Sequence, residues 1–452
     1  MTPLPRFPLT AALGEFVAGS HSLPAAALDV AAQGMADAAG LIVRARTQGI
    51  VQALVALQAQ GGPCSVLLGP QRASPIDAAM INAAAAHAFA LDDVAWGCHP
   101  SSMLMPALLA AGELCGASGQ DLLRAWVVGY EVLGELASRE PGSLHGTGWH
   151  PTGLLGPIGV AGAVAHLLGL DAAQARAALA NAASMTGGLS GNFGTPMKAV
   201  HVGMAAAAGV RAALLAQAGQ AGNADVLEKP GGFLETISPS RAVDLVCPLG
   251  TGPTSLRLLD AGLSLKRYPL CYSLHRLADA AIDVAGQPAY ALEQVARVEV
   301  EMGVRQLQMA PHRQPATELQ ARYSAPFAVA SGLVARAAGF AQLEPGFFGG
   351  DAVRRIIDCT RITPTHGINP EDPVFDQSDR VRVTLADGRL IDSGPVTHPL
   401  GHARRPLDAK ARQDKFMDCL EGSAVRDAAA CWQAMTGLAQ VPSAREIAAV
   451  FA

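Results

Sequence analysis

Lysine and histidine occur together in two segments where a turn leads into an expected helix. Lys198 follows the glycine-rich stretch GNFGTPM, and His201 comes three residues later on the same helical face. Lys266 precedes a turn at Pro269, and His275 follows at the start of the next helix. Because cations and helix N-termini both attract anions, the two segments together are suited to a substrate with more than one anionic group.

Lysine is rare in this chain. Of the 33 lysines and arginines only five are lysines, so arginine is the default cation. An amine shifts its pKa readily whereas a guanidinium stays charged, and we therefore expect Lys198 and Lys266 to serve a chemical role that arginine does not fill. The other lysines, Lys229, Lys410 and Lys415, stand among charged residues and are expected on the surface.

Two further histidines stand directly before proline in loop-like stretches. His99 lies in WGCHPSS and His150 in LHGTGWHPTG. Imidazole titrates near neutral pH and is the most frequent general acid or base, so both are expected to transfer protons at a reacting carbon. The residues expected to contact the substrate beside them are Asp93, His145, Thr152, His201, Arg267 and His275. The remaining histidines are expected to be structural: His21, His87, His166, His312, His366, His398 and His402.

The sequence offers no support for metal, nucleotide or nucleic-acid chemistry. HExxH, GxxxxGK[ST] and GxSxG motifs do not occur, and no GxGxxG match follows an expected strand. A net charge of −5 with scattered cations excludes a basic stripe for nucleic acid. The eight cysteines form no CxxC pair, which is typical of reduced thiols in a cytosol. We therefore expect a cytoplasmic protein with no metal and no cofactor.

The elements that must position these groups divide into two kinds. Alanine-rich helical patterns dominate the first half, for example at residues 28–41, 107–114, 120–137 and 201–219. A strand at 295–304 and a hairpin at 380–391, turning at Asp387-Gly388, alternate with helices near 324–338 and 351–359. The tail from residue 407 returns to helix.

A chain of 452 residues exceeds what one hydrophobic core usually organises, so two domains are expected. We predict a mainly α fold in which residues 1–262 and 403–452 form a large helical domain. Residues 263–402 would form a smaller α+β domain inserted into it.

Membrane association is not expected. The first residues lack the apolar stretch and cleavage site of a signal peptide. Residues 153–170 are apolar and long enough to span a bilayer, but Pro157, several glycines and His166 interrupt them. This stretch is therefore interpreted as a buried helix.

Several stretches resemble the MmgE/PrpD family in their order and spacing. They are His87 with Asp92 and Asp93, HPSS at 99–102, GWHPTG at 148–153, GTPMKAVHVG at 194–203 and LKRYPLCYSLH at 265–275. YSAPFAVA at 323–330 and PLDAKARQDKF at 406–416 extend the resemblance over nearly the whole chain. The family contains 2-methylcitrate dehydratase, cis-aconitate decarboxylase and iminodisuccinate epimerase.

The resemblance implies a helical domain built from both chain ends, an inserted α+β domain, an active site between the two, and a homodimer. It also implies that His99, His150, Lys198 and Lys266 are active-site residues. Two departures stand out, because the family's dehydratases and decarboxylases carry an aspartate where this chain has Ala90, and a tyrosine where it has Phe327. Asp92, Asp93 or Tyr323 are candidates to replace those groups.

All three family reactions move a proton at a carbon next to a carboxylate, which needs a base and groups that stabilise the resulting charge. The first hypothesis is a dehydratase-like lyase acting on a small di- or tricarboxylate, with His150 or His99 as the base and Lys198 and Lys266 as anion-binding groups. The second is an epimerase of an iminodisuccinate-like substrate, favoured by Ala90 and Phe327. The third is a polycarboxylate-binding relative without activity.

Overall fold

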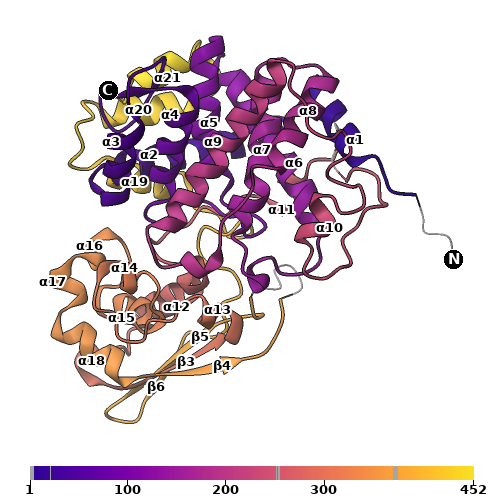
Figure 1. Ribbon diagram of the computed structural model, residues 1–452. Coiled ribbons are helices and arrows are strands. Elements are labelled where there is room, and N and C mark those ends of the chain that lie inside the picture. The colour runs from indigo at the N-terminus through magenta and orange to yellow at the C-terminus, as the bar shows by residue number, and fades with distance from the viewer. Residues whose placement is uncertain (1–4, 21, 251, 253–254, 370–374, 452) are drawn as a thin grey trace.

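Two hydrophobic cores organise the chain. A computed structural model describes residues 5–20, 22–250, 252, 255–369 and 375–451. One core takes its buried residues from Leu9 to Leu265 and again from Leu407 to Phe451, whereas the other takes them from Tyr268 to Ile391. Figure 1 shows the first part as a mass of helices and the second, in orange, as a smaller body beside it.

The described residues of the first part form helices joined by loops. Two short strands, β1 (Cys64–Ser65) and β2 (Arg72–Ala73), pair antiparallel. Its helices are α1 (Leu9–Ala18), α2 (Ala25–Arg44), α3 (Gly49–Gln58), α4 (Pro75–His87), α5 (Pro100–Cys115), α6 (Gly119–Ser138), α7 (Pro151–Leu167), α8 (Ala172–Ala183), α9 (Met197–Gln217), α10 (Phe233–Ile237), α11 (Arg257–Ala261), α19 (Ala409–Leu420), α20 (Ala428–Thr436) and α21 (Ala444–Ala449).

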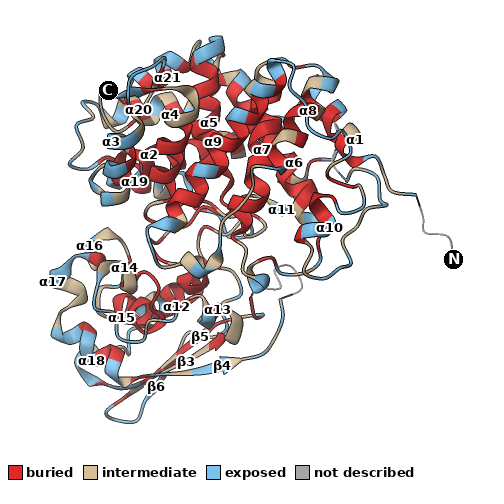
Figure 2. Cartoon of the chain, viewed as in Figure 1, coloured by how far each residue is buried: buried red, intermediate tan, exposed pale blue. Residues whose placement is uncertain are grey.

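Small residues let the central helices of this part approach closely. A Cβ added at Gly129 of α6 would lie 2.9 Å from the Gly159 carbonyl oxygen of α7, and one added at Gly209 of α9 would lie 2.4 Å from Val160. The abundance of alanine and glycine in the sequence is thus used to bring helix backbones together. Figure 2 shows these central helices as almost wholly buried.

The C-terminal helices pack against helices from the first third of the chain in this part. Helices α19 and α20 pack against α2, and α21 packs against α5 and α6. In Figure 1 the yellow C-terminal helices lie among the indigo N-terminal ones.

The second part combines a mixed sheet with short helices. Strand order is β4 (Thr360–Thr365), β3 (Val295–Gly303), β5 (Arg380–Leu385), β6 (Leu390–Asp392), with β3 parallel to β4 and the other pairs antiparallel. The helices are α12 (His275–Gly286), α13 (Val304–Gln308), α14 (Glu318–Ala321), α15 (Ala325–Ala335), α16 (Phe340–Leu343), α17 (Pro345–Phe348) and α18 (Asp351–Cys359). The predicted fold class, mainly α with a smaller α+β part, is confirmed.

Two helical stretches have the length and apolar composition of a membrane span, namely 25–47 and Met197–Gln217. In an 18-residue window of each stretch, 61% and 78% of the residues respectively are buried inside the protein, as in a core helix. The stretch expected to be a buried helix, now α7, is buried from Pro151 to Ala165. The eight cysteines, all in the described part of the chain, are unpaired.

The expectation that Lys415 lies on the surface is wrong. Its side chain is only 3% exposed, and its Nζ lies 2.6 Å from Asp37 Oδ1 and donates to the Leu91 carbonyl at 2.8 Å. Because α19 packs against α2, which carries Asp37, this face of α19 points inward. Lys410, on the outer face, is 79% exposed, and the Lys229 side chain is 36% exposed.

Replacing Lys415 should therefore destabilise the protein. Lys415→Met leaves Asp37 buried without its cation, which is expected to lower the free energy of unfolding by about 3–5 kcal/mol in urea titrations. The double variant Lys415→Met/Asp37→Asn should recover much of that loss, and Lys410→Met should change stability by less than about 0.5 kcal/mol. Wild-type stability in Lys415→Met would show that this ion pair does not secure α19.

Candidate active site

His99 and His150 occupy equivalent positions, each being the last residue before a helix. Pro100 begins α5 and Pro151 begins α7. Proline is well suited to the first helical position and keeps the residue before it out of the helical region, so each histidine is held where loop meets helix. Neither imidazole caps its own helix, which leaves the ring nitrogens for other contacts.

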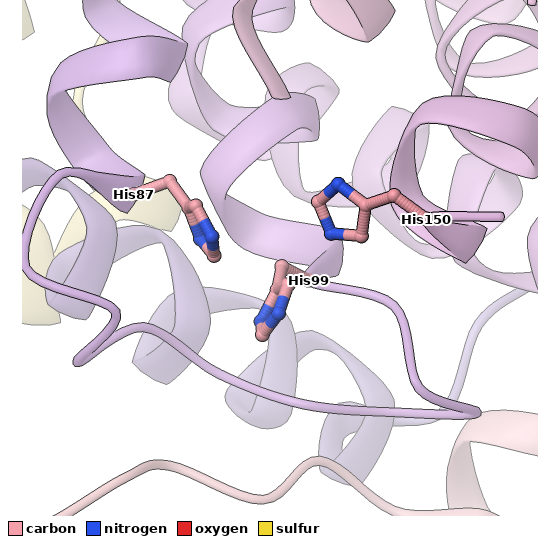
Figure 3. Close-up of side chains that lie close together, drawn as sticks. All are labelled: His87, His99 and His150. Carbon is pink, nitrogen blue, oxygen red and sulfur yellow. The ribbon is translucent and has the colours of Figure 1, made fainter. Parts of the chain in front are cut away.

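Three imidazoles gather at these junctions. His87, the last residue of α4, brings its ring centroid to 4.4 Å from that of His99 and 6.0 Å from that of His150. The His99 and His150 centroids are 6.1 Å apart. Figure 3 shows the three rings side by side, each from a different segment. All three side chains are buried, and His99 is the most accessible of them, at 6%.

Hydrogen bonds fix which nitrogen of two of these rings is basic. His99 Nδ1 lies 2.7 Å from the backbone carbonyl oxygen of Asp93. A carbonyl only accepts, so Nδ1 must carry the proton and Nε2 must hold the lone pair. His87 Nδ1 lies 2.7 Å from Asp92 Oδ2, and the same argument leaves its Nε2 unprotonated. His99 and His87 therefore both present a basic Nε2.

Burial and charge set the protonation of this cluster. Burial holds the pKa of His99 well below its ordinary value, although Asp92 opposes the shift, and burial lowers the pKa of His87 to about 4. Burial opposes ionisation of Asp92, but His87, His99 and Lys266 outweigh it and hold its pKa well below the ordinary value. At neutral pH the two imidazoles are thus neutral, while Asp92 is ionised and lies 3.3 Å from Lys266 Nζ.

A cavity of about 770 Å³ opens beside the cluster and is lined by both parts of the protein. From the helical part come His99, His145 and Lys198, and from the other part come Arg276 and Tyr323. Lys266, on the connection between the two cores, also lines it and donates to the Ala90 carbonyl at 2.9 Å. The volume is typical of a site for a small organic ligand.

Lys198 is a cation of this cavity with altered basicity. Its Nζ lies 4.9 Å from the centroid of the Phe193 ring. Burial, followed by repulsion from Lys266, lowers the pKa of Lys198 to about 8, although Cys271 and Asp92 oppose the shift. The amine is therefore mostly charged at neutral pH and close to losing its proton.

The residues predicted to contact substrate are placed differently from one another. His145 lines the cavity, with its ring 5.8 Å from that of Phe193. Asp93 and Thr152 do not line it, and both are buried. The Asp93 carboxylate accepts from the Ser101 backbone N–H at 3.1 Å, and burial raises its pKa to about 8.

His201, Arg267 and His275 also lie off the cavity wall. His201 packs behind His150, with their Nδ1 atoms 3.3 Å apart, and His275 sits between the rings of Tyr268 and Tyr272. His150 itself is 0% exposed and does not line the cavity in this structure. None of these residues lines the cavity. The sequence could not show this, because helical spacing does not reveal which side of a turn faces the cavity.

Several residues at the site were not predicted to act there. His87, expected to be structural, belongs to the imidazole cluster, and His402 and Arg276 line the cavity. The signal for His87 was its place five residues before the buried Asp92 to which it is bonded. Ala90 lines the cavity, whereas Phe327 is buried in the second core. Of the histidines expected to be structural, His21 lies outside the described residues.

The imidazole cluster also offers the ligand type of a metal site. One nitrogen from each of His87, His99 and His150 lies within 4.8 Å of the others, and the Nε2 atoms of His87 and His150 have no hydrogen-bond partner. Zinc bonds of about 2.0–2.1 Å would require the rings to close further around an ion. Lys198 and Lys266 on the same cavity would repel that ion, so the surroundings fit an anion better than a cation.

Chelation is therefore expected to leave the enzyme active. Turnover measured after dialysis against EDTA should stay within about twofold of the untreated value, because we expect imidazole and amine groups to supply the acid–base chemistry without a metal. The matched control is enzyme dialysed without chelator. Loss of turnover that added zinc restores would contradict this expectation.

Comparison with known proteins identifies the family of this chain. The MmgE/PrpD N-terminal domain matches residues 11–246 and the C-terminal domain matches residues 268–438. Cis-aconitate decarboxylase from Homo sapiens is 30% identical over 362 residues, covering 76% of this chain and 72% of that protein. The enzyme of the same name from Aspergillus terreus (strain NIH 2624 / FGSC A1156) is 28% identical over 384 residues, covering 78% and 76%. The chain therefore belongs to the MmgE/PrpD family and is an enzyme of the lyase type.

Proposed function

We propose that this enzyme moves a proton at a carbon next to a carboxylate group of a small di- or tricarboxylate, with no cofactor, and that elimination follows as in 2-methylcitrate dehydratase. The observation that carries the proposal is the neutral His99 imidazole on a cavity that Lys198 and Lys266 also line. A base beside two cations meets the main demand of this step, which is to stabilise enolate-like charge as it forms.

His99 is the best candidate for the base. Its Nδ1–H is held by the Asp93 carbonyl, so Nε2 is the nitrogen able to accept a proton from substrate. His87 and His150 pack around it, and in this proposal they position its ring. The shift of its pKa well below the ordinary value keeps it in the basic form across the neutral range.

Lys198 and Lys266 would bind the carboxylate that becomes enolate-like. Lys266 is fixed by Asp92 and by the Ala90 carbonyl, so it offers a pre-oriented charge. Lys198, at the first turn of α9, adds the positive end of that helix. An oriented cation costs little reorganisation when charge develops on the substrate, which is the basis of electrostatic catalysis.

An epimerase is the second candidate, and a specific observation favours it. Ala90 puts a methyl group on the cavity wall where the family's dehydratases and decarboxylases carry an aspartate. Epimerisation needs no leaving group but does need a second acid or base on the opposite face of the carbon. Tyr323 and Cys271, which line the cavity from the second part, are candidates for that role.

Reaction in deuterated water separates these outcomes. Purified enzyme would be incubated with 2-methylcitrate, citrate, cis-aconitate or iminodisuccinate and followed by proton NMR and ultraviolet absorbance. The proposal expects a new conjugated C=C from a hydroxy acid. Release of carbon dioxide from cis-aconitate would instead indicate a decarboxylase, and α-deuteration with inverted chirality and no unsaturated product would indicate an epimerase. Binding without exchange or turnover would identify an inactive relative.

The assembly and location in this proposal follow the resemblance to the family. The enzyme is proposed to act as a cytoplasmic homodimer without nucleic-acid or membrane partners. Size-exclusion chromatography with light scattering should give twice the mass of the chain. A monomer that is fully active would contradict the dimer.

A further inference from the structure

Arg276 is a buried cation on the cavity wall, and its charge has no direct carboxylate partner among the described residues. It is 4% exposed and lies in the first turn of α12, in the second part of the protein. Its guanidinium donates through Nη1 to the Asp376 backbone carbonyl at 2.8 Å, and its carbon lies 5.1 Å from the centroid of the Phe375 ring. Its Nε–H has no hydrogen-bond partner in the part of the chain that the structure describes. The guanidinium is thus oriented but not neutralised.

Two described acidic groups that interact with the Arg276 charge are engaged elsewhere. The Asp379 carboxylate accepts from Gln306 Nε2 at 3.0 and 3.2 Å, and the Asp376 carboxylate accepts from the backbone N–H groups of Gly367 and Gln377. Both acids interact with the Arg276 charge at longer range. Among the described residues, no carboxylate lies within 4.0 Å of the guanidinium. Burying an unpaired charge costs several kcal/mol, so an anion from outside the chain is the natural partner.

The position of Arg276 relative to the lysines indicates what that anion is. Lys198 and Lys266 line the same cavity, next to His99. Arg276 instead comes from the second core, together with Ser273 and Tyr272 of the turn before α12, which also line the cavity. The N-terminus of α12 adds its positive end to this corner. A ligand that reaches both the lysines and Arg276 must carry carboxylates at separated positions.

We infer that Arg276 and the first turn of α12 form a carboxylate subsite for the end of the substrate that is remote from the reacting carbon. Because Lys198 and Lys266 offer two further cations on the same cavity, the three cations together favour a substrate with three carboxylates, and Arg276 thereby selects tricarboxylates over dicarboxylates. The inference rests on the proposed function, since it assigns a further group on the same substrate. A guanidinium binds a carboxylate through two parallel hydrogen bonds, which gives such a subsite geometric as well as electrostatic selectivity.

Ligand binding without turnover tests this role. Isothermal titration would compare propane-1,2,3-tricarboxylate with glutarate and succinate, which each lack one of its carboxylates. Arg276→Gln should bind the tricarboxylate about 10- to 100-fold more weakly than wild type, as expected when a charged hydrogen-bonding partner is lost. Its affinity for at least one dicarboxylate should change less than about threefold, so the preference for three carboxylates disappears. Arg276→Lys should keep part of that preference.

The matched control is Arg305→Gln. Arg305 donates to the Gly367 carbonyl, in the same loop region as the Asp376 carbonyl that Arg276 holds, and it does not line the cavity. The Arg305→Gln variant should bind all three acids with the affinity of the wild type. An unchanged tricarboxylate affinity in Arg276→Gln, or an equal loss for all three acids, would refute the subsite while leaving the proposed function in place. Failure of the wild type to bind any of these acids would reject both.

Discussion

His99→Gln should lower kcat by about two to four orders of magnitude, the usual contribution of a general base. Glutamine keeps a polar side chain of similar length but has no nitrogen that accepts a proton from carbon. The substrate carboxylates would still meet Lys198 and Lys266, so KM should change by less than about threefold. Steady-state kinetics on the best substrate, together with exchange of the α-proton in deuterated water, measure the effect.

The control for this variant is His312→Gln, since His312 does not line the cavity and is half-buried. It should retain wild-type kcat. His87→Ala provides a further comparison, because His87 packs against the His99 ring without lining the cavity. We expect it to reduce kcat less than His99→Gln does. Equal kcat in His99→Gln and wild type would remove His99 from the mechanism.

Activity should fall as the pH rises through about 8. Burial and Lys266 lower the pKa of Lys198 to about 8, so its cationic form, which the anion requires, is lost on the alkaline side. His99 does not impose an acidic limit near neutrality, because its pKa lies well below the ordinary value and its basic form persists. Plots of log(kcat/KM) against pH should therefore be flat near pH 7 and bend downward near 8.

Lys198→Ala should lower kcat/KM by about 100- to 1,000-fold at pH 7, the size expected when one charge-stabilising group is removed. It should also abolish the downward bend near pH 8. Lys198→Arg keeps the charge at all these pH values. Its kcat/KM should be lower than that of wild type, but the plot of log(kcat/KM) against pH should not bend downward near 8. Lys410→Ala, on the exposed face of α19, is the matched control. A bend that persists unchanged in Lys198→Arg would assign it to another group.

Much of the fold could be predicted because its elements carry local signals. The hairpin was readable from alternation on either side of Asp387-Gly388, and α18 begins and ends at the predicted residues because Gly350 precedes it and a strand follows. Lys415 was misjudged for a physical reason. The charged residues around it occupy the outer face of α19, and only the packing of α19 on α2 shows that its own face is inside.

The site was harder to predict than the fold. The His-Pro pairs and the rare lysines identified His99 and Lys198, because their residue types are chemically distinctive. His87 was not predicted, because it ends an alanine-rich helix, where a lone histidine is usually structural. Arg276 could not be singled out in the sequence, because the chain has many arginines. Arg276 is buried and lacks a carboxylate partner among the described residues, and no sequence pattern shows that.

The wall of the cavity is shared by two cores that have no buried side chain in common. The nitrogen that we propose as the proton acceptor, His99 Nε2, belongs to the helical part, where even one added methyl group at Gly153 would lie 2.1 Å from the Gly187 carbonyl oxygen. Arg276 belongs to the other core. If Arg276 binds the remote carboxylate as proposed, substitutions there would alter which acid is bound without displacing the proposed base, and the reaction and the choice of substrate could diverge separately.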